Sequence, residues 1–200
     1  LRLRGPKFSR GEWIQIGKVD SPRGIGVDPT GRILVADYTQ GKVHSFALDR
    51  TFKIQSTHSV SSLRGPRFVC GAPAGGFVVS EECGDVKLFN CKRTLVGCLG
   101  ARYRHQFGNP AGVCADVEGN IIVADEQHRA VHLFPQRGSP LCLVSKGLRK
   151  PAGVACSNSG LLFVADAGDN CVKIFKYRVR PPYGPSNPRV ASDGPKPAPR

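Results

Sequence analysis

The 200-residue sequence contains no methionine and no long apolar run. Its apolar stretches, such as "LLFVA" at 161–165, fall far short of the roughly 18 to 20 residues that a membrane-spanning helix needs, and no apolar leader opens it. We therefore expect no membrane contact. Because the sequence opens on Leu1 and lacks methionine, we also expect it to be cut from a longer one.

The eight cysteines include no CxxC pair and follow no regular spacing. A disulfide framework is typical of short secreted chains, whereas this chain is long enough to bury a core. We expect buried or free thiols in a reducing, cytoplasmic setting and no zinc site. Cys70 and Cys114 each follow a proline by four residues, where a small buried side chain fits.

The net charge of +14 is concentrated at the two ends of the sequence. A basic N-terminal segment, 1–11, holds four basic residues and no acid. Residues 178–200 form a Pro-rich basic tail that is too poor in apolar residues to pack, and we expect it to be disordered. The segment 12–177 between them carries only a modest positive excess, so the charge alone does not establish nucleic-acid binding.

A repeat of about 44 residues organises the segment 12–177. Its units begin near 22, 66, 110 and 151. In each unit a glycine follows the opening proline by nine residues, an acid follows it by fifteen, and phenylalanine closes the unit. The prolines are Pro22, Pro66, Pro110 and Pro151, and the acids are Asp37, Glu81, Asp125 and Asp166.

Each unit reads as three strands joined by tight turns, with β-branched runs such as "NIIVAD" and no helical periodicity. A fourth strand follows the first three units, at 52–60, 94–100 and 140–145, and none follows the last. The segment "EWIQIGKV" at 12–19 is predicted to be a fourth strand without its first three. It either closes the last blade by pairing with it or belongs to a preceding blade whose remainder lies upstream, and the expected missing start favours the second. Four strands per repeat predict an all-β fold, a β-propeller with four recognisable blades.

The segments "VADYTQGKVHSF", "VADEQHRAVHLF" and "VADAGDNCVKIF" resemble the NHL repeat. The second unit departs from that pattern, with Phe68 in place of a glycine and "VSE" in place of "VAD". The resemblance implies a six-bladed ring, so the four blades are part of such a ring or an incomplete one. It also implies recognition of protein or RNA, often beside the RING or tripartite-motif regions of E3 ubiquitin ligases, and no RING-type cysteine and histidine spacing occurs here.

The recurring acids Asp37, Glu81, Asp125 and Asp166 favour a structural role, because a catalytic acid is needed once and not four times. At the end of a second strand such an acid can accept hydrogen bonds from the amides of the following turn. Related propellers include metal-dependent lyases and hydrolases, which need inward-facing histidines or carboxylates. No histidine lies in a P-x-G strand. We therefore predict no catalytic residue, no metal and no cofactor, with a metal-dependent enzyme as a remote alternative.

Basic and aromatic residues recur in the loops that enter the first strands and in the turns between the second and third strands. Propeller geometry places these loops on one face, and that face is the predicted binding site. Its residues are Arg23, Tyr38, Arg64, Arg67, Arg104, Phe107, Arg129, Arg149 and Lys150. The resemblance implies a protein partner, such as a ubiquitination substrate. Single-stranded RNA is the alternative, because it requires phosphate attraction and base stacking, although acids such as Glu126 and Asp169 weaken the field.

Overall fold

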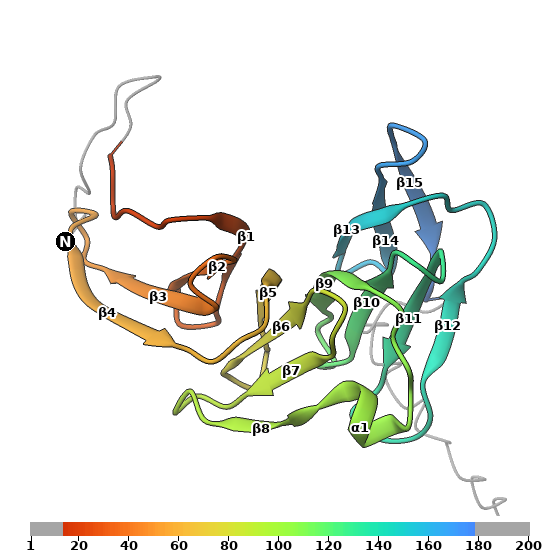
Figure 1. Cartoon of the computed structure of the whole chain (residues 1–200), viewed down its shortest axis with the longest axis horizontal. Coiled ribbons are helices and arrows are strands. Elements are labelled where there is room, and N and C mark those ends of the chain that lie inside the picture. The colour runs from red at the N-terminus through yellow and green to blue at the C-terminus, as the bar shows by residue number, and fades with distance from the viewer. Residues whose placement is uncertain (1–13, 179–200) are drawn as a thin grey trace, which may run out of the picture.

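The computed structural model describes residues 14–178, which form four antiparallel sheets arranged as the blades of a propeller (Figure 1). Blade 1 holds β1 (Pro22–Val27), β2 (Ile33–Asp37), β3 (Lys42–Leu48) and β4 (Ile54–Val60). Blade 2 holds β5 (Pro66–Gly71), β6 (Phe77–Glu81), β7 (Val86–Phe89) and β8 (Leu95–Cys98). Blade 3 holds β9 (Pro110–Ala115), β10 (Ile121–Asp125), β11 (Ala130–Phe134) and β12 (Leu141–Val144), and blade 4 holds β13 (Pro151–Cys156), β14 (Leu161–Asp166) and β15 (Cys171–Lys176).

Each blade is a meander in which sequence neighbours pair, so the first strand lies innermost and the last outermost. The four blades follow one another along an open arc, with blade 1 and blade 4 at its two ends (Figure 1). The prediction of an all-β propeller with four blades is therefore confirmed, including the three-stranded last unit.

The innermost strands β1, β5, β9 and β13 lie next to one another in chain order. Glycine permits this close approach of backbones. A β-carbon added at Gly112 of β9 would lie 2.4 Å from the carbonyl oxygen of Ala152 in β13, and one added at Gly24 would lie 2.5 Å from the Cα atom of Phe68. The close spacing of the innermost strands at the axis therefore requires glycine, which has no side chain, at these positions.

The core lies between the blades, because alternate residues of each second strand face opposite neighbours. In β10, Ile122 and Ala124 face blade 4 and belong to one buried cluster with Leu162 of β14. Ile121 and Val123 face blade 2, in a cluster with Val78. A third cluster joins blade 1 to blade 2. Each blade thus presents one apolar face to the blade before it and another to the blade after it.

Two sequence-based expectations differ from the structure. The predicted strand at 12–19 is wrong within the described part, because residues 14–19 form no strand. The outermost strand of blade 4, β15, lies at the other end of the arc from this segment (Figure 1). A β-carbon added at Gly17 would lie 3.3 Å from the ring of Phe46. A short helix, α1 (Leu99–Tyr103), was not predicted and takes up the end of the expected strand 94–100.

The two ends of the chain fall largely outside the described residues. The predicted basic segment 1–11 and residues 179–200 of the predicted tail lie there. Arg178, which the sequence analysis placed in the tail, contacts the propeller: its Nη2 atom lies 2.5 Å from Asp116 Oδ2 and 3.0 Å from Glu118 Oε2. All eight cysteines are unpaired, with Cys70 and Cys114 partly buried. Between residues 14 and 178, no helix has the length and apolarity to cross a bilayer.

Candidate binding face

The four recurring acids occupy equivalent, buried places at the ends of β2, β6, β10 and β14. In each blade the acid stands directly across from the proline that opens the first strand, as in the pairs Pro22 with Asp37 and Pro151 with Asp166. This pairing places the carboxylate beside the loop that precedes the first strand. The loops before the first strands and the turns after the second strands therefore meet at the acids, and we call the surface they form the binding face.

Asp125 shows how the carboxylate holds both loops. Its oxygens accept hydrogen bonds from the amides of Gly108 at 2.8 Å and Asn109 at 3.1 Å, which precede β9. It also accepts one from the amide of His128 at 3.2 Å, in the turn after β10. Asp37 does the same with the amides of Asp20, Ser21 and Gln40. Hydrogen bonds to the following turn were predicted from the sequence, whereas those from the preceding loop were not.

A basic side chain from the third strand faces the acid in three of the blades. His44 Nε2 lies 3.4 Å from Asp37 Oδ2, and Lys87 Nζ lies 2.8 Å from Glu81 Oε1. In blade 4 the equivalent residue is Lys173. All three follow the opening proline of their unit at corresponding positions. This shared spacing was recognised from the sequence for the histidines, and the lysines at the same repeat position were missed.

Blade 3 is the exception to this pairing. Its equivalent residue, His132, lies in an aromatic cluster instead, with its ring centroid 4.7 Å from that of His105. His105 in turn packs against Phe107 and Phe134. Burial lowers the pKa of both histidines, so burial favours their neutral forms. Asp125 is instead approached by His128, whose Nδ1 lies 2.9 Å from Oδ2.

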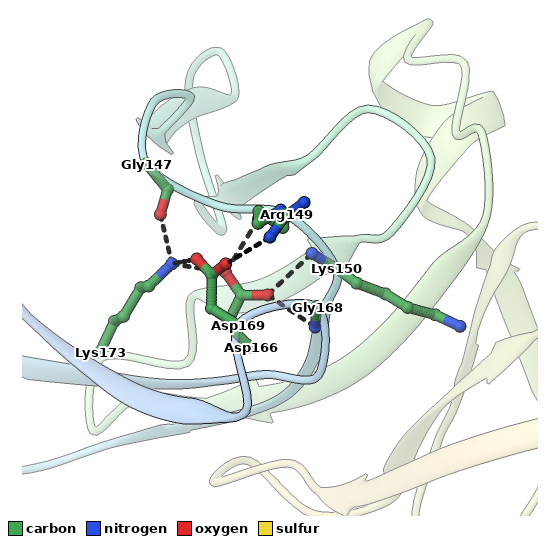
Figure 2. Close-up of polar contacts among 7 residues, drawn as sticks. All are labelled: Gly147, Arg149, Lys150, Asp166, Gly168, Asp169 and Lys173. Atoms are coloured by element: carbon green, nitrogen blue, oxygen red, sulfur yellow. Dashed lines mark hydrogen bonds and ion pairs between the residues drawn. The ribbon is translucent and has the colours of Figure 1, made fainter.

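Asp166 of blade 4 is held by backbone amides from both loops and by a lysine side chain (Figure 2). It accepts hydrogen bonds from the amides of Arg149 at 2.9 Å, Lys150 at 2.8 Å and Gly168 at 3.1 Å, and from Lys173 Nζ at 2.7 Å. Lys173 also contacts Asp169 and donates to the carbonyl of Gly147. Only the backbone of Lys150 takes part, since its side chain points away from this cluster (Figure 2).

The environment stabilises the ionised form of these acids. Burial raises the pKa of Asp166, but the Lys173 ammonium and the backbone amides outweigh it, so the pKa lies below its ordinary value. The pKa values of Asp37 and Asp125 are lowered in the same way, against burial, by their backbone amides. Hydrogen bonds to Asp166 and Asp169 raise the pKa of Lys173. The loops of the binding face are thus held around charged groups.

Several of the predicted binding residues form contacts between blades. Arg67 of blade 2 reaches Glu126 of blade 3 with an Nη2 to Oε2 distance of 3.0 Å, and Lys150 of blade 4 reaches the same carboxylate at 3.2 Å. Burial raises the pKa of Glu126, and the hydrogen bonds from Arg67 and Lys150 more than offset it, so the pKa is lowered. Three blades are therefore joined through one acid.

Tyr38 makes a second contact of this kind. Its hydroxyl donates to the Glu82 carboxylate of blade 2, and the guanidinium of Arg23 lies 4.7 Å from its ring centroid. Arg149 lies 3.4 Å from Asp169 within blade 4, with 72% of its side chain exposed. The acids that the sequence analysis regarded as weakening a positive field are direct partners of the basic residues.

The remaining predicted residues are not brought into these contacts. Arg64, Arg104 and Arg129 are exposed, and their side chains form no ion pair with any residue of 14–178. Arg104 follows α1 with a φ of 52°. Phe107 is partly buried and packs against His105 and Phe134. Residues 14–178 contain no group of three or more histidines, cysteines or acids arranged to hold a metal ion.

Comparison with known proteins gives three kinds of match. The sequence model of the NHL repeat matches residues 148–175. NHL-repeat-containing protein 4 of Mus musculus is 52% identical over 130 residues, which cover 65% of this chain and 96% of that protein. The E3 ubiquitin-protein ligase TRIM32 of Mus musculus is 30% identical over 181 residues, and the match covers 82% of this chain but only 28% of the ligase.

A solved structure shares the fold. The WD40 β-propeller domain of Doa1 superposes with a TM-score of 0.61 at 18% identity, covering 80% of this chain. The chain spans 52% of that domain, about half of its length. This likeness supports the propeller architecture and carries nothing about activity.

Proposed function

Because the chain belongs to the NHL-repeat family, we propose that it is a non-catalytic platform that binds a protein partner through the binding face. The observation that carries this proposal is the set of acid–base pairs between blades, above all Arg67 and Lys150 on Glu126. A surface on which both signs of charge alternate suits a protein, whose own surface carries both signs. A nucleic acid instead requires a continuous positive field.

The exposed basic residues of the same face supply specific contacts in this proposal. The exposed Arg23 lies over the ring of the half-buried Tyr38, and arginine and tyrosine are enriched among the residues that contribute most binding energy at interfaces. Arg64 and Arg129 are exposed and carry no acid of their own among residues 14–178, so they are free to pair with acids of a partner. The partner we expect therefore presents acidic side chains beside a planar or apolar group.

We further propose that this partner is a substrate for ubiquitination. The support is the similarity to TRIM32, which is named as an E3 ubiquitin-protein ligase and which this chain matches over 28% of its length. In this proposal the chain selects the substrate and another polypeptide segment supplies the ligase chemistry. The cytoplasmic location expected from the sequence stays a prediction.

A charge-reversal variant of the binding face tests the proposal. Proteins captured by the full-length chain are compared with those captured by Arg64→Glu/Arg129→Glu and by the matched control Arg50→Glu/Arg137→Glu, whose exposed arginines lie in turns on the opposite side of the blades. We expect a partner that the unmodified chain and the control retain and the face variant loses. With that partner purified, its dissociation constant should rise at least tenfold for the face variant only. Equal binding by all three proteins would refute the binding face.

An RNA titration separates the alternative reading. Binding of a labelled random-sequence 20-nucleotide single-stranded RNA is measured for the full-length chain over a salt series, with the face variant beside it. We expect weak binding that falls steeply with salt and that is the same for both proteins, because the basic ends alone would cause it. RNA binding that depends on Arg64 and Arg129 would favour RNA as the ligand instead of a protein.

A further inference from the structure

Each internal interface joins the face that one blade presents to the following blade with the face that the next blade presents to the preceding one. Blade 1 and blade 4 each carry one of these two kinds of face on their outer side. In each unit the residues eleven and thirteen positions after the opening proline face the preceding blade, as Leu162 and Val164 do in blade 4. The residues twelve and fourteen positions after it face the following blade, as Ile122 and Ala124 do in blade 3. Blade 1 has no described blade before it and blade 4 has none after it, so one such face is left open at each end (Figure 1).

The open face of blade 1 is apolar. Ile25 of β1 is 73% exposed, whereas the equivalent residues Val69 and Val113 in the next two blades are 3% and 6% exposed. Val27 is 61% exposed beside it. The face is hollowed: a cavity of about 800 Å³ lies between residues 16–20 and this sheet, lined by Ile25 and Phe46 among others. At the internal interfaces this space is filled by apolar side chains of the preceding blade, and no described blade precedes blade 1.

The open face of blade 4 is apolar as well. Val172 and Ile174 of β15 are 63% and 61% exposed. Their equivalents in blade 3, Val131 and Leu133, are 0% and 7% exposed, because blade 4 covers them. The end units of a repeat array that is free in water carry polar outer faces. These two faces keep the side chains of an internal interface, which indicates that they are covered when the protein functions.

We propose that these faces bind each other between two copies of the chain, blade 4 of one copy packing on blade 1 of the next. Each copy carries both kinds of face, and the three internal interfaces show that such faces pack together between successive blades. Val172 and Ile174 of the second copy would enter the cavity beside Ile25, displacing part of segment 16–20. The contact is head-to-tail, so it differs from a two-fold symmetric dimer, in which each face would meet its own copy.

Mass measurement over a concentration series tests the contact. We use the full-length chain in reductant, because Cys171 is exposed on the blade 4 edge. Multi-angle light scattering should show the mass rising with concentration from 21.5 kDa to at least twice that value. A mass that stays at one chain over the whole series would overturn the proposal and assign the faces to a different occupant.

Two blocked variants then establish the direction of the contact. Ile25→Glu/Val27→Glu blocks one end and Val172→Glu/Ile174→Glu blocks the other. Each variant alone should remain a monomer, and their mixture should form a complex that stops at two chains. The control Val117→Glu, an exposed apolar residue (47%) in a turn of blade 3, should associate like the unmodified chain. A mixture that remains monomeric, or single variants that still associate, would contradict a head-to-tail contact.

Cross-linking of the unmodified chain gives a readout that does not depend on the variants folding. Lys18 lies beside the blade 1 cavity and Lys176 ends β15, and both are exposed. In a mixture of ¹⁴N and ¹⁵N chains, an amine-reactive cross-linker should join Lys18 of one isotope to Lys176 of the other. Links between copies that join only Lys18 to Lys18 would refute the proposal, as would the absence of any link between copies.

Discussion

Blade 3 and blade 4 place the same acid at the same position and surround it differently. Asp125 accepts three backbone amides and is approached by His128, whose side chain is 49% exposed. Asp166 accepts three amides and the ammonium of Lys173, which is 22% exposed. The repeat therefore conserves the hydrogen-bonded loops and leaves the neutralising base free to vary. The difference teaches that the amides are the common requirement, whereas the basic side chain beside the acid differs from blade to blade.

The largest expected effect comes from removing each acid. We expect Asp166→Ala to lower the free energy of unfolding by about 3 kcal/mol, since it leaves three amides and the ammonium of Lys173 without their acceptor. Asp125→Ala should cost about 2 kcal/mol, because water can hydrate His128 in its place. Urea denaturation at pH 7 measures both. Equal losses in the two alanine variants would remove the distinction between the blades.

The next effect is a difference in pH response. The folded-state pKa values of His105 and His132 in and beside blade 3 are lowered by burial. Just below about pH 6.5 the unfolded chain therefore binds more protons than the folded chain. The contribution of these two neutral histidines to the free energy of unfolding is complete above that pH and is lost as the pH falls. The pKa of Asp166 is also lowered, and its contribution persists until the pH falls below about 4.

Hydrogen exchange resolves these two windows. Between pH 7 and pH 5, after correction for intrinsic exchange rates, protection should decrease in β10 and β11 and remain unchanged in β14 and β15. The variant His132→Phe keeps an aromatic side chain and removes one titrating group, so it should reduce the decrease in blade 3. A parallel loss of protection in both blades would show that the histidines do not cause it.

A smaller effect should follow from changing the base in blade 4. Lys173→Gln removes the ammonium while leaving the three amides on Asp166, so the pKa of Asp166 should move back toward its ordinary value. Because that carboxylate then protonates at higher pH, the midpoint of acid unfolding should shift upward. Circular dichroism during acid titration measures the midpoint. Lys176→Gln, an exposed lysine of the same strand, is the matched control and should leave the midpoint in place.

The smallest effects concern the pairs on the binding face. Arg149→Gln should change the free energy of unfolding by less than about 0.5 kcal/mol, because its pair with Asp169 is largely exposed. Arg67→Gln should cost about 1 kcal/mol, since both Arg67 and Glu126 are 16% exposed and the pair joins two blades. Thermal denaturation of the two variants compares them. A larger loss for Arg149 would mean that exposure does not rank these pairs.

The sequence was sufficient to predict the blades because each unit repeats its proline, glycine, acid and phenylalanine in register. The strand prediction is wrong for the segment 14–19, which has the composition of a strand but pairs with no sheet. The helix α1 has no capping signal, since Cys98 precedes it without a side-chain hydrogen bond, so local sequence gave no indication of it.

The binding face was predictable in position and not in its pairing. Loop positions follow from the repeat, and Arg23, Arg67 and Lys150 are placed there by counting residues. Which acid each one meets depends on the rotation from blade to blade, as for Arg67 and Glu126, which are 59 residues apart. The packing of Phe107 likewise depends on the course of the chain after α1. Whether these residues bind a partner stays a prediction.

The close approach at the axis also affects tolerance to mutation. At Gly112 even one methyl group would meet the carbonyl of Ala152. Because the contacted atom belongs to the backbone, no flexible side chain can move to relieve the contact. Alanine there would push the two innermost strands apart, and a displacement on the order of tenths of an ångström at the axis would increase the separation of the two blades progressively toward the rim. Substitutions at this glycine are therefore expected to change the spacing of the loops of the binding face while leaving every residue of those loops intact.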